Sequence, residues 1–267
     1  MTARARAQQV TKIAIGDEDR VFVLTGAGIS AESGLSTFRD SNGLWERERV
    51  EDVASPSGWR RDPERVWRFY SQRRQAASKA QPNPAHLALA ELEQRLGERF
   101  FLCTQNVDNL HERAGSRNLV HMHGELFLSR CERCDRTPFA DSALYETRAA
   151  HRFCECGGRI RPDIVWFGEV PYHMERIFEE LEGCTVMLVV GTSGVVQPAA
   201  SFVRWASERR ARGSRALRTC YVGPEHPANA AAFTKVFEGR AGELLPQLLA
   251  RDISGNHDLG NSGEVCG

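Results

Sequence analysis

Two close pairs of cysteines, Cys131-x2-Cys134 and Cys154-x-Cys156, have the spacing of metal ligands in this 267-residue chain. Two thiolate pairs separated by about 20 residues can hold Zn²⁺ in a tetrahedral site. Four sulfur ligands leave no open coordination position, so the pattern predicts one structural zinc rather than a catalytic zinc. The alternative, unpaired cysteines in a polar loop, fits this spacing less well.

A glycine-rich loop, Gly26–Gly34, directly follows the apolar run Val21–Thr25. Glycines let the backbone approach a pyrophosphate, and we expect the loop to open a helix whose N-terminus favours negative charge. The glycine spacing is longer than in the usual dinucleotide fingerprint, and the acidic residue expected about 20 positions later is missing. By itself, the loop indicates nucleotide binding but leaves open a turn that only packs a helix on a strand.

Three polar residues, Gln105, Asn106 and Asp108, come just after the apolar run Phe100–Thr104. Ligands of open α/β sheets bind at the carboxyl ends of strands, so these side chains are well placed to contact a cofactor. An Asn/Asp cluster after a strand is also ordinary turn chemistry, and position alone does not decide between the two.

Two histidines, His121 and His123, stand at the end of a weaker apolar run, Leu119–His121. A histidine at this place can act as a general base near neutral pH. We expect one of the two to have a structural role instead.

An extended apolar segment, Arg161–Glu169, directly follows the second cysteine pair. It could present a free edge to which an extended peptide adds as a strand. A buried strand is an equally good interpretation of the same pattern.

Strands must alternate with helices to position these residues. Further buried runs are Val186–Val190 and Thr219–Val222, and helical patterns cover Pro63–Lys79, His86–Leu96 and Ala199–Arg212. This alternation predicts an α/β fold, a Rossmann-like parallel sheet with helices on both faces. A small lobe would combine a zinc-ribbon module with a helical insertion.

The expected organisation divides the chain into four parts. Residues 1–39, 84–126 and 163–251 would form the Rossmann-like domain and residues 40–83 the helical insertion. Residues 127–162 would form the zinc module, and the Gly/Asn/Ser-rich tail 252–267 is expected to be disordered.

Composition excludes some classes of function. The formal net charge is zero, so nothing draws the chain to nucleic acid, and no apolar run reaches the roughly 18 residues of a membrane span. The N-terminus lacks the apolar core of a secretory signal, and paired cysteines then favour a metal site in a reducing cytoplasm. We expect a cytoplasmic monomer in which Cys103 and Cys184 are buried.

In their order along the chain, these motifs resemble the sirtuin family of NAD-dependent protein lysine deacylases. The resemblance covers about residues 18–250 and rests on Gly26–Gly34, Thr37-Phe38-Arg39, Thr104–Asp108, His123-Gly124, the four cysteines, Val165–Glu169 and Gly191-Thr192-Ser193. It implies that the acyl oxygen of an acyl-lysine attacks the nicotinamide ribose of NAD. Nicotinamide, free lysine and O-acyl-ADP-ribose would be the products, with acylated proteins or peptides as partners.

The resemblance also implies a site. His123 would be the general base, with Asn106 and Asp108 as further catalytic residues, and the zinc would only hold the small lobe in shape. The substrate backbone would pair with Val165, Trp166, Phe167, Gly168 and Glu169. NAD would contact Gly26, Ala27, Gly28, Ser30, Ala31, Phe38, Arg39, Gln105, Asn106, Val107, Asp108, Gly191, Thr192, Ser193 and Ala241.

The helical run Pro63–Lys79 indicates which acyl group is removed. Tyr70 and Arg73 are three residues apart and share one helix face. An arginine fork binds a carboxylate with two hydrogen bonds, and a tyrosine hydroxyl can add a third. Sirtuins with a Tyr-x-x-Arg motif prefer acidic acyl groups, so we expect deacetylation and desuccinylation. The alternative is that Arg73 is an ordinary surface arginine, because this part of the chain is rich in arginines: Arg60, Arg61, Arg65, Arg68 and Arg74.

The chain departs from the sirtuin pattern at Gly223. After the last predicted strand the family usually has an asparagine that contacts the adenine ribose, and glycine has no side-chain amide. Backbone groups could substitute, or the affinity for NAD could be lower. If the amide matters, Gly223→Asn should lower the Michaelis constant for NAD.

Three competing functions remain. ADP-ribosyl transfer uses the same NAD cleavage with a different acceptor. A non-catalytic NAD sensor would not need His123, Asn106 and Asp108, and a zinc-ribbon interaction protein would leave the glycine loop unexplained.

Overall fold

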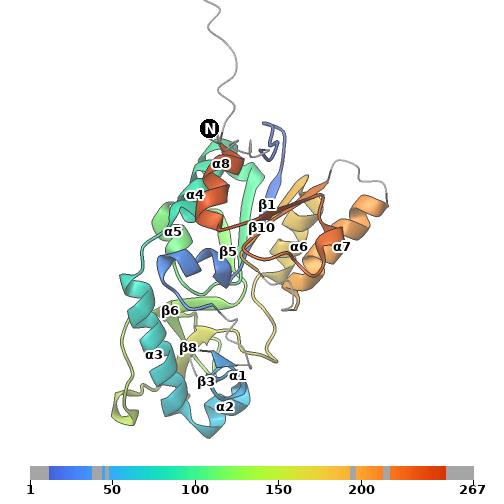
Figure 1. Cartoon of the computed structure of the whole chain (residues 1–267). Helices are drawn as coiled ribbons and strands as arrows, with labels where there is room; N and C mark the ends of the chain where they lie inside the picture. Colours follow the sequence, from blue (N-terminus) through green and yellow to red (C-terminus); the bar gives the residue numbers. More distant parts are fainter. Residues whose placement is uncertain (1–11, 38–43, 46–47, 193–196, 213–216, 251–267) are drawn as a thin grey trace, which may run out of the picture.

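The computed structural model describes residues 12–37, 44–45, 48–192, 197–212 and 217–250. Its larger part is a six-stranded parallel sheet in the order β11-β10-β9-β1-β4-β5 (Figure 1). The strands are β1 (Val21–Thr25), β4 (Phe100–Thr104), β5 (Leu119–His121), β9 (Val186–Val190), β10 (Arg218–Gly223) and β11 (Lys235–Glu238).

The five strands predicted from apolar runs are confirmed, four of them with the predicted ends and β10 one residue longer at each end. β11 is not predicted from the sequence. Its end residues are exposed and its two middle residues half-buried, so this edge strand has no apolar run.

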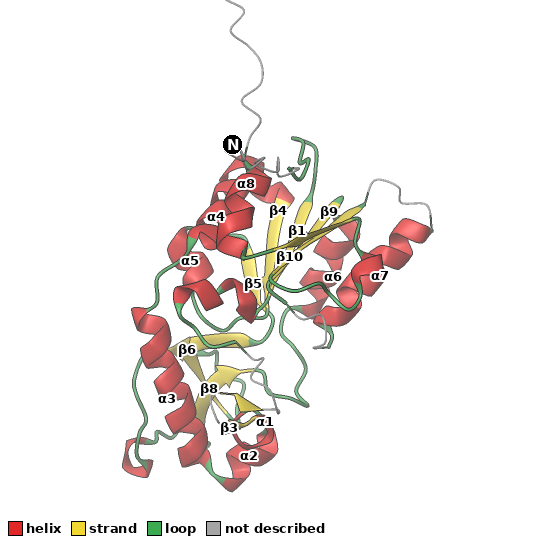
Figure 2. Cartoon of the chain, viewed as in Figure 1, coloured by secondary structure: helices red, strands yellow, loops and turns green. Residues whose placement is uncertain are grey.

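Helices cover both faces of the sheet (Figure 2). Val21 and Val23 of β1 pack against α4 (Pro84–Leu96) and α8 (Ala241–Leu249). Phe22 and Leu24 point to the opposite face, as alternate residues of a strand must, and pack against helices there. These helices are α6 (Met174–Gly183) and α7 (Ala199–Ala211); the short α5 (Leu110–Ala114) follows β4.

The small lobe contains a three-stranded antiparallel sheet in the order β7-β6-β8 and a helical part. Its strands are β6 (Gly124–Cys131), β7 (Phe139–Ala140) and β8 (Ile160–Ile164), and a separate hairpin pairs β2 (Leu44–Trp45) with β3 (Glu48–Arg49). The helices are α1 (Val50–Val53), α2 (Pro56–Arg61) and α3 (Pro63–Lys79). Within the described residues, no helix has the length and hydropathy needed to cross a membrane.

Helix α3 has the bounds predicted for it. Its start is fixed by Asp62, whose carboxylate accepts from the N–H of Arg65 at 2.9 Å, and by Pro63 in the first turn. One face buries Val66, Trp67 and Tyr70 against β6 and β8, and Nε1 of Trp67 donates to the carbonyl of Ile160 at 3.2 Å. The helix is therefore held firmly against the small sheet.

Candidate active site

A cavity of about 500 Å³ lies between the small lobe and the carboxyl ends of β1, β4 and β9. The residues that directly follow these strands, Gly26, Gln105 and Gly191, all line it. From β1 the chain builds β4 and β5 on one side and then β9, β10 and β11 on the other. Open α/β sheets bind ligands at such a switch point, so the fold itself marks this cavity as the site.

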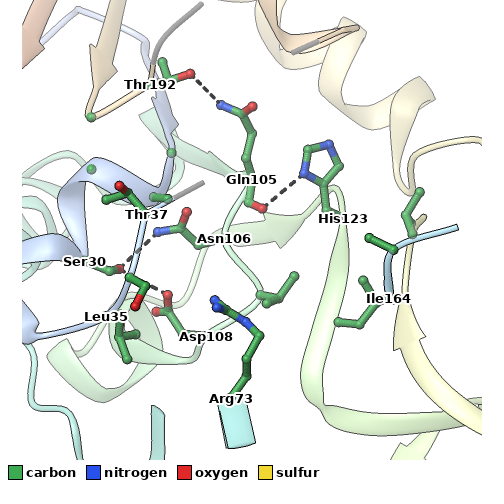
Figure 3. Close-up of a pocket in the computed structure, with 18 of the residues that line it drawn as sticks. Ser30, Leu35, Thr37, Arg73, Gln105, Asn106, Asp108, His123, Ile164 and Thr192 are labelled. Carbon is green, nitrogen blue, oxygen red and sulfur yellow. Dashed lines mark hydrogen bonds between the residues drawn. The ribbon is translucent and has the colours of Figure 1, made fainter. Parts of the chain in front are cut away.

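Ser30 joins the two polar residues Asn106 and Asp108 in this cavity (Figure 3). Its Oγ donates to Oδ2 of Asp108 at 3.1 Å and accepts from Nδ2 of Asn106 at 3.1 Å. Burial raises the pKa of Asp108 above its ordinary value, although hydrogen bonds from Leu110 and Ser30 act in the opposite direction. The network fixes an amide and a carboxyl group at the cavity wall.

His123 is held by the backbone of the neighbouring strand end (Figure 3). Its Nδ1 lies 3.1 Å from the carbonyl oxygen of Gln105. A carbonyl oxygen only accepts, so Nδ1 carries the hydrogen and Nε2 keeps its lone pair. Burial lowers the pKa of His123 below its ordinary value, which keeps the ring neutral at pH 7. Nε2 is therefore a base at a cavity wall.

His121 has the structural role expected for one of the two histidines. Its Nδ1 lies 2.7 Å from the carbonyl of Asn106 and its Nε2 lies 2.7 Å from Oε1 of Glu112. Burial alone would lower the pKa of His121, but the hydrogen bond and charge of Glu112 outweigh it and raise the pKa. The ring therefore ties Asn106 to α5 and is not among the residues that line the cavity.

The glycine loop packs directly on the end of β9. The N–H of Gly28 donates to the carbonyl of Gly191 at 2.8 Å, and a Cβ at Gly28 would lie 2.7 Å from that oxygen. The expected helix after this loop is wrong: the chain forms two single 3₁₀ turns, Ala27–Ile29 and Ala31–Ser33, ended by Gly34 at φ 84°. The backbone that lines the cavity here therefore belongs to 3₁₀ turns and not to the N-terminus of an α-helix.

Tyr70 and Arg73 of α3 both line the cavity. The Tyr70 hydroxyl accepts from Nε1 of Trp166 at 3.1 Å, and burial raises the pKa of Tyr70 to about 12. Arg73 reaches into the cavity beside Asp108 (Figure 3). Arg74, the next residue in this arginine-rich helix, is not exposed, because its side chain is buried in the small lobe.

The segment Arg161–Glu169 combines both interpretations made from the sequence. Its first part lies in the buried strand β8, and Val165 to Glu169 follow along the cavity. The N–H groups of Val165 and Phe167 donate to the carbonyls of His123 and Ala54, at 2.9 and 3.0 Å.

Glu169 acts within the chain. Its carboxylate accepts from Nη1 and Nη2 of Arg161 at 2.7 and 3.0 Å and from the N–H of Trp166 at 2.8 Å. These bonds close the turn after β8, while the half-exposed ring of Phe167 remains beside the cavity.

The four predicted cysteine ligands come together in the small lobe, at the end of β6 and in the segment before β8. Their sulfur atoms all lie within 4.8 Å of one another. The Sγ atoms of Cys131 and Cys156 are 3.5 Å apart, and those of Cys134 and Cys154 are 3.8 Å apart. A tetrahedron with Zn–S bonds of about 2.3 Å requires about 3.8 Å between sulfurs, so the cluster fits a closed, structural zinc site.

The structure places most of the predicted NAD-contacting residues around the cavity, with clear exceptions. Ala241 does not line it; this residue is buried at the start of α8, where Glu32 accepts from the N–H of Gly242 at 2.9 Å. Phe38, Arg39, Ser193 and the tail 252–267 lie outside the described residues. Lining residues not predicted from the sequence include Gln197, Tyr221 and Glu225.

Comparison with known proteins agrees with this arrangement. A model of the Sir2 family matches residues 26–198. This chain belongs to the Sir2 family. An NAD-dependent protein deacylase from Shewanella oneidensis is 46% identical over 240 residues, which cover 88% of this chain and 95% of the relative. One from Caulobacter vibrioides is also 46% identical, covering 87% of this chain and 98% of the relative.

Solved structures of Sir2 proteins share the fold. A Sir2 homologue in complex with NAD is 40% identical with a TM-score of 0.77, covering 87% of this chain and 89% of that one. A Sir2 mutant with a p53 peptide and NAD is 27% identical with a TM-score of 0.72, covering 87% of this chain and 93% of that one. The resemblance noted in the sequence is therefore confirmed at the level of the family.

Proposed function

We propose that this member of the Sir2 family removes acidic acyl groups such as succinyl, as well as acetyl, from lysine side chains. Its family and its curated relatives make the chain an NAD-dependent protein deacylase that acts on acylated proteins. One observation carries the finer proposal: Tyr70 and Arg73 line the same cavity as His123.

In the proposed chemistry, the acyl oxygen would attack the nicotinamide ribose of NAD as nicotinamide leaves. A ribose hydroxyl would then attack the acyl carbon, and addition of water would release free lysine and O-acyl-ADP-ribose. His123 Nε2 would take the proton from a ribose hydroxyl, because its tautomer and lowered pKa leave that nitrogen unprotonated at neutral pH. Asn106 and Asp108, held by Ser30, would orient the ribose and nicotinamide.

The acyl end is the part of the site that would select substrates. Burial keeps Tyr70 protonated, and its oxygen already accepts from Trp166, so its hydrogen can be donated to a ligand. Arg73 adds a positive charge on the same helix face, one turn away. A carboxylate at the end of an acyl chain would bind both groups.

ADP-ribosyl transfer is the alternative that shares the NAD cleavage. The apolar segment beside His123 supports a lysine acyl arm as acceptor: Val165 is half-buried and the exposed Phe167 ring borders the cavity. A transferase would instead modify protein side chains without needing Tyr70 and Arg73.

The test compares one peptide carrying either acetyl-lysine or succinyl-lysine. Arg73→Met should lower kcat/KM for the succinyl peptide by about 10- to 150-fold, the value of hydrogen bonds to a charged group, and change the acetyl value little. Arg68→Met is the matched control, because Arg68 lies on the same helix but is exposed and paired with Glu64. Equal losses for both peptides in Arg73→Met would contradict the proposal.

A further inference from the structure

The end of β10 departs from the sirtuin pattern at Gly223. The structure shows which group lies where a side chain at position 223 would be. A Cβ at Gly223 would contact the hydroxyl of Tyr221 and would lie 2.7 Å from its Cζ and 3.1 Å from its Cε1. The two residues are two apart on a strand and point to the same face. The phenol of Tyr221 therefore fills the place where a side chain at position 223 would begin.

The phenol is fixed in that place. Tyr221 is 2% exposed, and its ring centroid lies 5.5 Å from that of Phe233 at an interplanar angle of 55°. It belongs to the hydrophobic cluster that packs α7 on the sheet. Because close-packed neighbours surround the ring, it cannot swing aside cheaply to admit a larger residue at position 223.

Tyr221 nevertheless lines the cavity, together with Pro224 and Glu225. These residues lie at the end of β10, on one side of β1. Asn106 and His123 follow β4 and β5, which lie on the other side of β1. A dinucleotide crosses a switch point with one half on each side. If the nicotinamide half lies beside His123, the adenosine half lies beside Tyr221.

We propose that the hydroxyl of Tyr221 binds a hydroxyl of the adenine ribose of NAD, in place of the side-chain amide that Gly223 lacks. A phenol both donates and accepts, as a ribose hydroxyl does, so the pair can form with either group as donor. Gly223 is then a requirement of this arrangement, because only a residue without Cβ leaves room for the phenol. The inference rests on the NAD use stated above.

This assignment reverses the expectation made from the sequence for Gly223→Asn. The new side chain would collide with the phenol and displace the group that binds the ribose. Gly223→Asn should weaken the binding of ADP-ribose rather than strengthen it.

Calorimetric titration with ADP-ribose tests the contact without catalysis. Tyr221→Phe removes only the hydroxyl and should weaken binding about three- to tenfold, as expected for one hydrogen bond. The control is Tyr145→Phe, which removes a buried hydroxyl that donates to Asp141 at 3.0 Å in the small lobe. It should bind ADP-ribose like the wild type.

Analogues of ADP-ribose that lack the 2′- or the 3′-hydroxyl of the adenine ribose separate direct contact from an indirect effect. The wild type should bind one analogue several-fold more weakly than ADP-ribose, and Tyr221→Phe should not distinguish that analogue from ADP-ribose. If Tyr221→Phe binds ADP-ribose as tightly as the wild type, or still binds the analogue more weakly than ADP-ribose, the inference about Tyr221 is overturned. Either result would leave the use of NAD unaffected. A wild type that does not bind ADP-ribose at all would overturn the use of NAD as well.

Discussion

Arg74, next to the cavity-lining Arg73 on α3, should contribute to stability rather than to specificity. Its side chain is 1% exposed and forms an ion pair of 3.3 Å with the buried carboxylate of Asp141. The guanidinium also donates over 2.7–3.2 Å to Ser129 Oγ and to the carbonyls of Leu126, Leu128 and Ala143. These bonds connect α3 to β6 and to the segment after β7.

The substitution Arg74→Met keeps much of the side-chain volume but removes the charge and all of these donors. It leaves the carboxylate of Asp141 buried without its cation. Breaking a buried ion pair by removing one partner costs about 3–5 kcal/mol, a large part of the roughly 5–15 kcal/mol by which a typical domain is stable. The control Arg68→Met removes an exposed pair with Glu64 and should cost at most about 1 kcal/mol.

Urea denaturation followed by tryptophan fluorescence measures this loss directly. Trp59, Trp67 and Trp166 lie in the core of the small lobe, and the Arg74 guanidinium lies 5.2 Å from the ring centroid of Trp67. The unfolding midpoint should fall strongly for Arg74→Met and little for Arg68→Met. At low temperature, the folded Arg74→Met protein should keep the wild-type ratio of succinyl to acetyl activity. Equal midpoints for the two variants would refute the reasoning.

Three further predictions concern pH, the glycine loop and the zinc. Burial lowers the pKa of His86 to about 4, below its unfolded value of 6.5. Because the unfolded state then binds more protons than the folded state, the free energy of unfolding must fall as the pH drops from about 6.5 towards 4. Urea titrations at pH 7.5 and 5 should differ by roughly 2 kcal/mol on account of this group, and His86→Gln should reduce that difference; an unchanged difference would contradict the assignment. Gly28→Ala should weaken ADP-ribose binding in calorimetry more than the control Gly16→Ala does, because a Cβ at Gly28 would meet the Gly191 backbone whereas one at Gly16 would make only an ordinary contact with Asp19; equal effects would argue against the close approach. Chelation of zinc should shift the tryptophan emission of the small lobe, and a fluorescence spectrum that does not change on chelation would rule out a structural role for the metal.

Buried apolar runs made the central sheet predictable. β1, β4 and β9 consist entirely of buried residues, so their pattern identifies them and their ends. β11, β6 and β7 lack this signal: β6 mixes buried and half-buried residues, and β7 has two residues. β8 is buried throughout, but Arg161, Pro162 and Asp163 interrupt its apolar residues. Their pairing depends on tertiary contacts that the sequence pattern does not encode.

Site residues were predictable where a motif or a helical period fixes their direction. The spacing of Tyr70 and Arg73 places both on one face, and both line the cavity. The same rule does not distinguish an exposed arginine from the buried Arg74, because that depends on acceptors supplied by β6 and its neighbours. Tyr221 carries no motif, and its relation to Gly223 follows only from the packing of its ring.

The most direct test of the account is product analysis by mass spectrometry with NAD and matched acetyl- and succinyl-lysine peptides. The wild type should form equal amounts of deacylated peptide, nicotinamide and O-acyl-ADP-ribose from each peptide. His123→Ala should form none of them, because His123 is the one histidine among the described residues that line the cavity. Undiminished deacylation by His123→Ala, or ADP-ribosylated protein without deacylated peptide, would contradict the account.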